Sequence, residues 1–202
     1  MISERADVGP AVSHAPRSGD FAAELCAVSP DVETRVPEEI VIRESRSEDA
    51  AQLHAAIDRV ARERRFIGLL EAPPVQDVAA FCSRPGVASS VAVCGGAIVG
   101  WADVQRIQRL GFTHRGILGM GVISTYRRQG VGRRLLTTMI DRSRSFGVTR
   151  LELEVFRSNV AAVSLYQQYG FRLEGQLLRA RILDGIADDI LLMARFDDHS
   201  VP

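Results

Sequence analysis

The most informative run of the sequence is Tyr126-Arg127-Arg128-Gln129-Gly130-Val131-Gly132-Arg133-Arg134-Leu135-Leu136, in which a basic, glycine-spaced segment leads into an apolar one. Residues 117–123 before it are apolar or glycine and can form a buried strand. From its second half onward, Val131, Leu135 and Met139 recur at helical spacing. The run is therefore predicted to be a turn between a strand and a helix.

Such a turn has the chemistry of a phosphate site. Gly130 and Gly132 have no Cβ, so an anion can approach the amides of the first helical turn closely. Unpaired N–H groups and the helix dipole favour an anion there, and four arginines add positive charge. Taken alone, the run could also be a solvated basic turn. It lacks the Lys-Ser/Thr pair of a P-loop and the third glycine of a dinucleotide fingerprint, so neither of those sites is supported.

Two motifs, in the same order, resemble those of the GCN5-related N-acetyltransferase (GNAT) family. The pattern Arg127-x-x-Gly130-x-Gly132 is similar to the loop with which that family binds the pyrophosphate of coenzyme A. Asn159, followed seven residues later by Tyr166 and then by Gly170-Phe171, is similar to a second motif of the family. The resemblance covers about residues 40–196 and implies an α/β fold with a single mixed, mostly antiparallel sheet flanked by helices.

The resemblance also implies roles for individual residues. It places the pyrophosphate of acetyl-CoA on the backbone of residues 128–134 and the pantetheine arm along the strand edge near Val122. Asn159 would hold that arm or the proton network, Tyr166 would protonate the leaving thiolate, and Glu154 would accept the proton of the amine. No metal is expected. The implied coenzyme-binding residues are Val122, Arg127, Arg128, Gln129, Gly130, Val131, Gly132, Arg133, Arg134 and Asn159.

Both proposed catalytic residues have a plainer interpretation. On its helix alone, Tyr166 is an ordinary core aromatic. Glu154 belongs to the alternating run Leu151-Glu-Leu-Glu-Val155, whose acidic face can simply meet solvent. In many relatives the base is an acidic residue on the fourth or fifth strand, and the fourth strand here offers only glycine and methionine. Glu152 and His114 are weaker candidates for the base.

Composition limits the classes of protein to which the chain can belong. With 202 residues, 46% of them hydrophobic, it is long enough for one globular domain with a sizeable core. Its 25 basic and 25 acidic side chains balance, so neither nucleic acid nor a membrane is expected as a partner. Three widely spaced cysteines fit neither a disulfide framework nor a zinc site. The absence of a signal-peptide pattern predicts a cytoplasmic protein, and a homodimer is left open.

The chain is expected to consist of a tail and one domain. Residues 1–38 hold four prolines among small and charged residues and are predicted to be a flexible tail, followed by a GNAT domain over residues 39–198. Ser45 and Glu48 stand at capping-box spacing before the first helix. Helices are expected at about 48–64, 74–84, 131–146 and 159–169. Strands are expected at 40–43, 87–94, 97–108, 117–124, 151–155, 171–175 and 190–196, with turns at Gly95-Gly96 and Asp184-Gly185.

Together these observations predict an acetyl-CoA-dependent N-acetyltransferase in which a primary amine attacks directly within a ternary complex. A small molecule or an amino acid is favoured as the acceptor, because the chain shows no separate peptide-binding element. A protein N-terminus, as in acetyltransferases of the ribosomal-protein type, is an alternative acceptor. A coenzyme-binding sensor that does not catalyse is another alternative, and the presence of both Asn159 and Tyr166 favours the enzyme.

Overall fold

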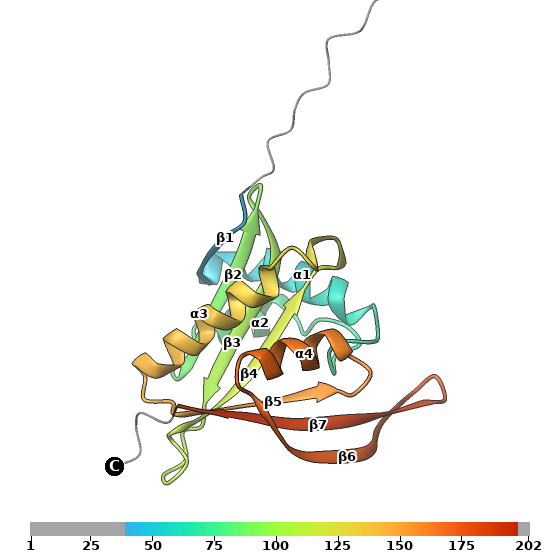
Figure 1. Cartoon of the computed structure of the whole chain (residues 1–202). Helices are drawn as coiled ribbons and strands as arrows, with labels where there is room; N and C mark the ends of the chain where they lie inside the picture. Colours follow the sequence, from blue (N-terminus) through green and yellow to red (C-terminus); the bar gives the residue numbers. More distant parts are fainter. Residues whose placement is uncertain (1–38, 198–202) are drawn as a thin grey trace, which may run out of the picture. The chain divides into compact units, whose positions relative to one another are not determined.

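The computed structural model describes residues 39–197, which form seven strands and four α-helices around one sheet (Figure 1). In chain order the elements are β1 (Val41–Glu44), α1 (Ala50–Ala61), α2 (Val75–Cys82), β2 (Val87–Cys94), β3 (Ala97–Arg106), β4 (Arg115–Val122), α3 (Val131–Ser145), β5 (Arg150–Phe156), α4 (Val160–Gln168), β6 (Arg172–Leu183) and β7 (Ile186–Phe196). Short 3₁₀ helices at Ser47–Asp49 and Ser124–Tyr126 precede α1 and α3. The tail expected at residues 1–38 lies outside the described residues.

The strands lie in the order β1-β2-β3-β4-β5-β7-β6. Every neighbouring pair is antiparallel except β4 and β5, which run parallel. The expected mixed, mostly antiparallel sheet is therefore confirmed. The order of strands and helices along the chain is also as expected, because the periodicity of apolar residues that defines each element is a local property.

Helices cover both faces of the sheet. On one face α3 and α4 pack over a core whose fully buried members include Leu135, Leu136 and Met139. On the other face α1 and α2 pack over a second core that contains Val60 and Val91. Figure 1 shows α3 and α4 in front of the sheet and α1 and α2 behind it. The central strands are buried on both faces. Successive side chains along such a strand point to opposite faces and therefore belong to different cores.

Both two-residue turns predicted from the sequence are present. Gly95 and Gly96 join β2 to β3 with φ of 54° and 77°, and Asp184 and Gly185 join β6 to β7 with φ of 52° and 77°. Positive φ at both central residues is the type I′ geometry, whose twist matches that of the flanking strands. The β6–β7 hairpin is longer than expected. The sequence does not reveal its outer part, because most side chains there are exposed and show no apolar alternation.

The start of the first helix corrects one expectation. Ser45 and Glu48 do not form the expected capping box; instead the Asp49 carboxylate accepts a hydrogen bond from the Arg46 amide at 2.8 Å. Asp49 also accepts bonds from both terminal nitrogens of Arg43 in β1, at 2.6 and 2.7 Å. This strand–helix ion pair holds the Asp49 carboxylate in the capping position, whereas Glu48 bonds only to the exposed Arg46 guanidinium.

Candidate active site

β4 and β5 separate part-way along their length. Their paired residues run only from Arg115 with Arg150 to Ile117 with Glu152, whereas β4 continues to Val122. Figure 1 shows the two strands diverging beyond this point. From residue 118 on, β4 pairs within the described sheet with β3 alone. Its other edge can therefore accept an extended ligand as an added strand.

The turn after β4 presents a row of backbone donors. Within residues 39–197 the amides of residues 128–133 have no hydrogen-bond acceptor, and the Arg134 amide is the first to close a helical bond, to the Gly130 carbonyl at 3.0 Å. Arg128 and Gly130 have φ of 63° and 80°, so the turn enters the left-handed region twice. Successive N–H groups in such a turn, at a helix N-terminus, form an anion-binding arrangement. This geometry matches the phosphate cradle expected from the sequence.

The two glycines of the turn are needed for different reasons. At Gly130 the backbone conformation itself disfavours a side chain, because φ is 80°. Gly132 is helical, and a Cβ there would lie 3.6 Å from both Leu165 Cδ2 in α4 and Met120 Cε in β4. A longer side chain at position 132 would therefore extend into the space between β4 and α4.

Arg127 fastens the turn to the segment that follows α1. Its terminal nitrogens donate to both carboxylate oxygens of Glu63 at 2.7 and 2.6 Å, and its Nε donates to the Val122 carbonyl at 2.8 Å. The Phe66 ring centroid lies 4.4 Å from its guanidinium carbon. Glu63 neutralises this guanidinium, and the Arg127 amide donates to the Ser124 carbonyl at 3.2 Å, so Arg127 positions the turn and leaves little free charge for a ligand. A ligand that pairs with β4 would use backbone groups other than the engaged Val122 carbonyl.

The remaining arginines of the turn also differ from one another. Arg134 donates to the Ile40 carbonyl at 2.6 Å, which directs its guanidinium towards the start of β1. Arg128 and Arg133 are exposed and form no ion pair with another described residue. The positive charge around the turn that a ligand could use comes from these two side chains.

Tyr166 on α4 belongs to the core and still offers a donor. It is 8% exposed, and its ring packs against Phe171 with a centroid separation of 5.7 Å. Burial raises the pKa of its phenol to about 12. The hydroxyl forms no hydrogen bond with another described residue, so it is available to a ligand. The core interpretation and the catalytic one are therefore compatible.

Asn159 begins α4. Its side chain caps the helix, with Oδ1 accepting from the Ala162 amide at 3.3 Å. The Ser158 hydroxyl donates instead to Asp188 in β7 at 2.5 Å. The Asn159 side-chain NH₂ has no acceptor among the described residues and can donate to a ligand.

β5 carries two carboxylates in different environments. Glu152 accepts hydrogen bonds from Arg115 and from Arg150, and the Arg115 bond is the main reason that its pKa lies below the ordinary value. Glu154 is exposed and forms no ion pair within the described part of the chain. Of the two carboxylates, Glu154 is therefore the one free to take up a proton.

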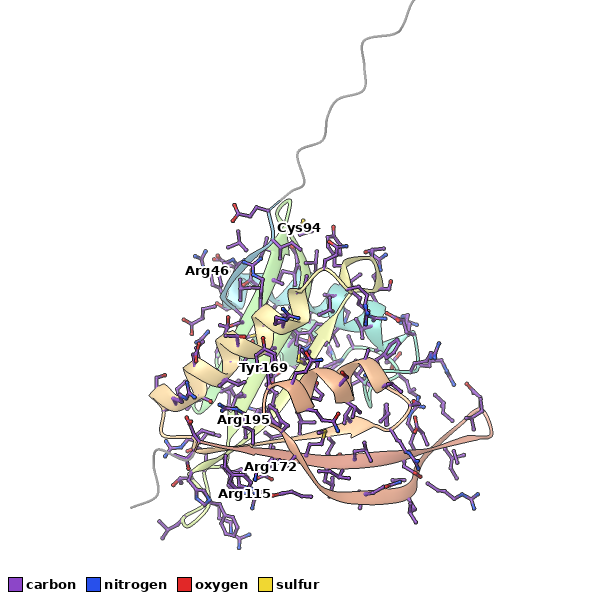
Figure 2. The ribbon with its side chains drawn as sticks, in the orientation of Figure 1. Arg46, Cys94, Arg115, Tyr169, Arg172 and Arg195 are labelled. Carbon is purple, nitrogen blue, oxygen red and sulfur yellow. The ribbon has the colours of Figure 1, made fainter. Side chains whose placement is uncertain are left out.

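Neither His114, a weaker candidate for the base, nor Trp101, a large aromatic residue of β3, belongs to the turn that follows β4. His114 is exposed and precedes β4, whereas the glycine-spaced turn follows that strand. Figure 2 shows its neighbour Arg115 at the lower end of the sheet, with Cys94 at the upper end. Trp101 is 7% exposed and belongs to the core under α1 and α2, where its ring lies against Gly121. It is a core residue, as its place in β3 suggests.

One buried carboxylate was not among the sequence candidates. Asp103 in β3 is 8% exposed. Its only signal in the sequence is that it is the one charged residue in the otherwise apolar run Ala97–Val104. The carboxylate faces the core under α1 and α2, on the same side of β3 as Trp101 two residues earlier.

Comparison with known proteins places the chain in a family. A model of the Acetyltransferase (GNAT) family matches residues 50–171. The chain belongs to the GNAT family. L-amino acid N-acetyltransferase AaaT from Escherichia coli is 31% identical over 162 residues, which are 78% of this chain and 98% of AaaT. The [ribosomal protein bS18]-alanine N-acetyltransferase of that bacterium is 46% identical over 55 residues, 27% of this chain and 37% of that enzyme.

A solved structure agrees with this assignment. The structure of yncA from Salmonella typhimurium, with its cofactor acetyl-CoA, has a TM-score of 0.73 at 21% identity and covers 81% of this chain and 97% of that one. This match confirms the predicted fold. The family model and the match to AaaT confirm the predicted activity class, and this GNAT protein is an N-acetyltransferase.

The described residues contain neither a cluster that could hold a metal ion nor a helix that could cross a membrane. In residues 39–197 no three His, Cys, Asp or Glu side chains gather closely enough to hold a metal ion. No helix of this GNAT domain is long and apolar enough to cross a membrane, again counting only the described part of the chain.

Proposed function

We propose that this GNAT protein transfers the acetyl group of acetyl-CoA directly to the primary amine of an L-amino acid or a related small molecule. The row of donor amides at residues 128–133 carries the proposal, together with the adjoining edge of β4. The amides offer a site for the pyrophosphate, and the strand edge offers partners for the pantetheine arm. A coenzyme held at both places would bring its thioester to the point where β4 and β5 separate.

The transfer needs two proton movements. The amine nitrogen attacks the thioester carbonyl carbon, so a C–N bond forms and the C–S bond breaks. We assign Glu154 as the acceptor of the amine proton, directly or through water, and Tyr166 as the donor to the departing thiolate. The surroundings that raise the Tyr166 pKa also destabilise a nearby thiolate, which keeps the proton transfer close to balanced.

A protein N-terminus is the second candidate acceptor. Leu153-Glu154-Val155 followed by Asn159 resembles the protein N-terminal acetyltransferase branch, and the local match to the bS18-alanine enzyme supports it. That match spans little more than a third of the enzyme, whereas the match to AaaT spans nearly all of it. The amino acid class is therefore placed first.

A screen for thiol release tests the proposal. Purified protein with acetyl-CoA should release free thiol with one or more L-amino acids, and release little with a peptide that has a free N-terminal alanine. Release with the peptide alone would favour the second acceptor class. If none of the amines tested causes thiol release, while calorimetry still detects coenzyme A binding, the protein would be a coenzyme-binding module that does not catalyse.

We expect coenzyme affinity to depend on the glycines of the turn more than on an arginine beside them. Gly130→Val places a β-branched residue at φ 80°, and Gly132→Val fills space between β4 and α4, so each should weaken binding roughly 10-fold or more. Arg133→Ala is the control and should cost less than about 1 kcal/mol, since it removes one exposed charge. Calorimetry with coenzyme A measures all three. Unchanged affinity in both glycine variants would contradict the phosphate cradle.

A further inference from the structure

A buried carboxylate on β3 has no role in the transfer described above. The one hydrogen-bonding group that reaches Asp103 among the described residues is the side chain of Gln105. No arginine in residues 39–197 pairs with it. The similarly buried Asp49, by contrast, has the Arg43 guanidinium. An ionised carboxylate that is buried without a cation is costly in free energy, so Asp103 must either take up a proton or receive a cation from outside.

Two glycines on β4 make room for side chains from β3. Gly119 is the paired residue of Asp103, and Gly121 is the paired residue of Trp101. A Cβ on Gly121 would come within 2.2 Å of the Trp101 ring, and one on Gly119 would lie 3.3 Å from Asp103 Oδ1. The Asp103 carboxylate thus lies over the backbone of β4, where a side chain of that strand would otherwise be.

This position adjoins the place where β4 leaves β5. Gly119 follows Ile117, the last β4 residue paired with β5, by two positions. Because side chains alternate along a strand and paired residues share a face, Asp103, Glu152 and Glu154 all lie on the same side of the sheet. Gly119 is itself partly exposed, so solvent reaches β4 beside the Asp103 carboxylate.

We propose that Asp103 binds the acceptor, its carboxylate receiving the ammonium group of the substrate beside Gly119. The inference rests on the proposed function, because it requires an amine acceptor. A hydrogen bond from an ammonium to a carboxylate is stronger than one between neutral groups. The ammonium also supplies the cation that the buried side chain lacks. Glu154 then accepts a proton from the nitrogen that Asp103 holds. Asp103 is thus a specificity-determining residue that favours a free ammonium over an amide or a hydroxyl group.

The groups around Asp103 supply no unpaired positive charge. From α2, Cys82 faces it as a neutral thiol, because burial raises the pKa of that side chain. On the same face, Glu154 adds negative charge, Arg115 and Arg150 are engaged with Glu152, and Asp49 is neutralised within its own ion pair. Burial raises the pKa of Asp103 to about 7. A bound ammonium favours the ionised carboxylate, so it should lower that pKa and displace a proton.

Carbon-13 NMR of protein labelled at the aspartate carboxyl groups tests the binding without any catalysis. One carboxyl should titrate near pH 7, and this signal should be missing from Asp103→Asn. Methylammonium chloride should lower the midpoint of that titration by about one pH unit. Tetramethylammonium chloride, which has no N–H to donate, should shift it much less. A titration that does not respond to methylammonium would overturn the proposal, whether or not the protein acetylates amines.

Kinetics separate this role from a structural one. With an acceptor found in the thiol-release screen, Asp103→Asn should raise KM for the amine roughly 10- to 100-fold, with little change in kcat or in coenzyme affinity. Asp49→Asn is the matched control, since it also alters a buried carboxylate and should lower the thermal midpoint without changing KM. An unchanged KM in Asp103→Asn, or an equal rise in both variants, would overturn the proposal.

Discussion

Tyr166→Phe should lower kcat by roughly 10²- to 10⁴-fold and leave the affinity for coenzyme A nearly unchanged. The substitution removes only the hydroxyl, so the ring keeps its packing against Phe171. Without that donor the thiolate must leave as an anion in surroundings that disfavour charge. The raised pKa of about 12 keeps the phenol protonated, so the loss should be the same from about pH 6 to pH 9.

Tyr169, at the end of the same helix, provides the control. Its hydroxyl accepts a hydrogen bond from Thr137 in α3 at 3.3 Å, and Figure 2 shows the side chain beside that helix. Tyr169→Phe loses only this exposed contact and should keep kcat within about twofold. Steady-state thiol release measures both variants. Full activity of Tyr166→Phe would leave that tyrosine as a core residue and remove the proposed general acid.

Glu154→Gln should cause a loss of rate that depends strongly on pH. At low pH the acceptor is largely an ammonium ion, and the proposed reaction needs Glu154 to take its proton. At higher pH more of the amine is already neutral, so the variant should recover part of the activity. A pH profile of kcat/KM should therefore show the largest difference at its acid end. A loss that is uniform across pH would assign Glu154 to acceptor binding instead.

Glu152→Gln is the control for this profile, because the two residues lie on one face of β5. It breaks the bonds with Arg115 and Arg150 and should cost about 1–3 kcal/mol of stability without the pH-dependent rate loss. The depressed pKa of Glu152 means that its stabilisation is present above the ordinary pKa of 4.5 and is lost as pH falls through the folded value. The difference in Tm between this variant and the unmodified protein should therefore shrink on acidification.

Several features of the fold were predictable because they depend on neighbours in the sequence. The turns Gly95-Gly96 and Asp184-Gly185 follow from residues that tolerate positive φ, and both are present. The glycine-spaced run 126–136 predicts a strand, a turn and a helix, and the structure contains all three. The family assignment needed only this run and the motif that ends at Gly170-Phe171.

Other features depended on partners that are distant in the sequence. The first helix is capped by Asp49 rather than Glu48, because Arg43 of the adjacent strand pairs with Asp49. The charge of Arg127 is matched by Glu63, which lies 64 residues earlier in the chain. The place of Arg127 in the glycine-spaced motif therefore did not reveal the partner of its guanidinium. The outer part of the β6–β7 hairpin is held by strand pairing between exposed residues, which leaves no apolar pattern to detect.

By itself, the sequence determined the order of the elements and the glycine-spaced turn with its unpaired amides, because backbone conformation and the unpaired amides of a helix N-terminus are local properties. Only the tertiary structure decided which carboxylate is free for which task. Glu152 is taken by two arginines, Glu154 remains open, and Asp103 lies buried over Gly119. The charge state of a carboxylate depends on its burial and on the cations that other strands bring to it. Residues adjacent in the sequence encode neither.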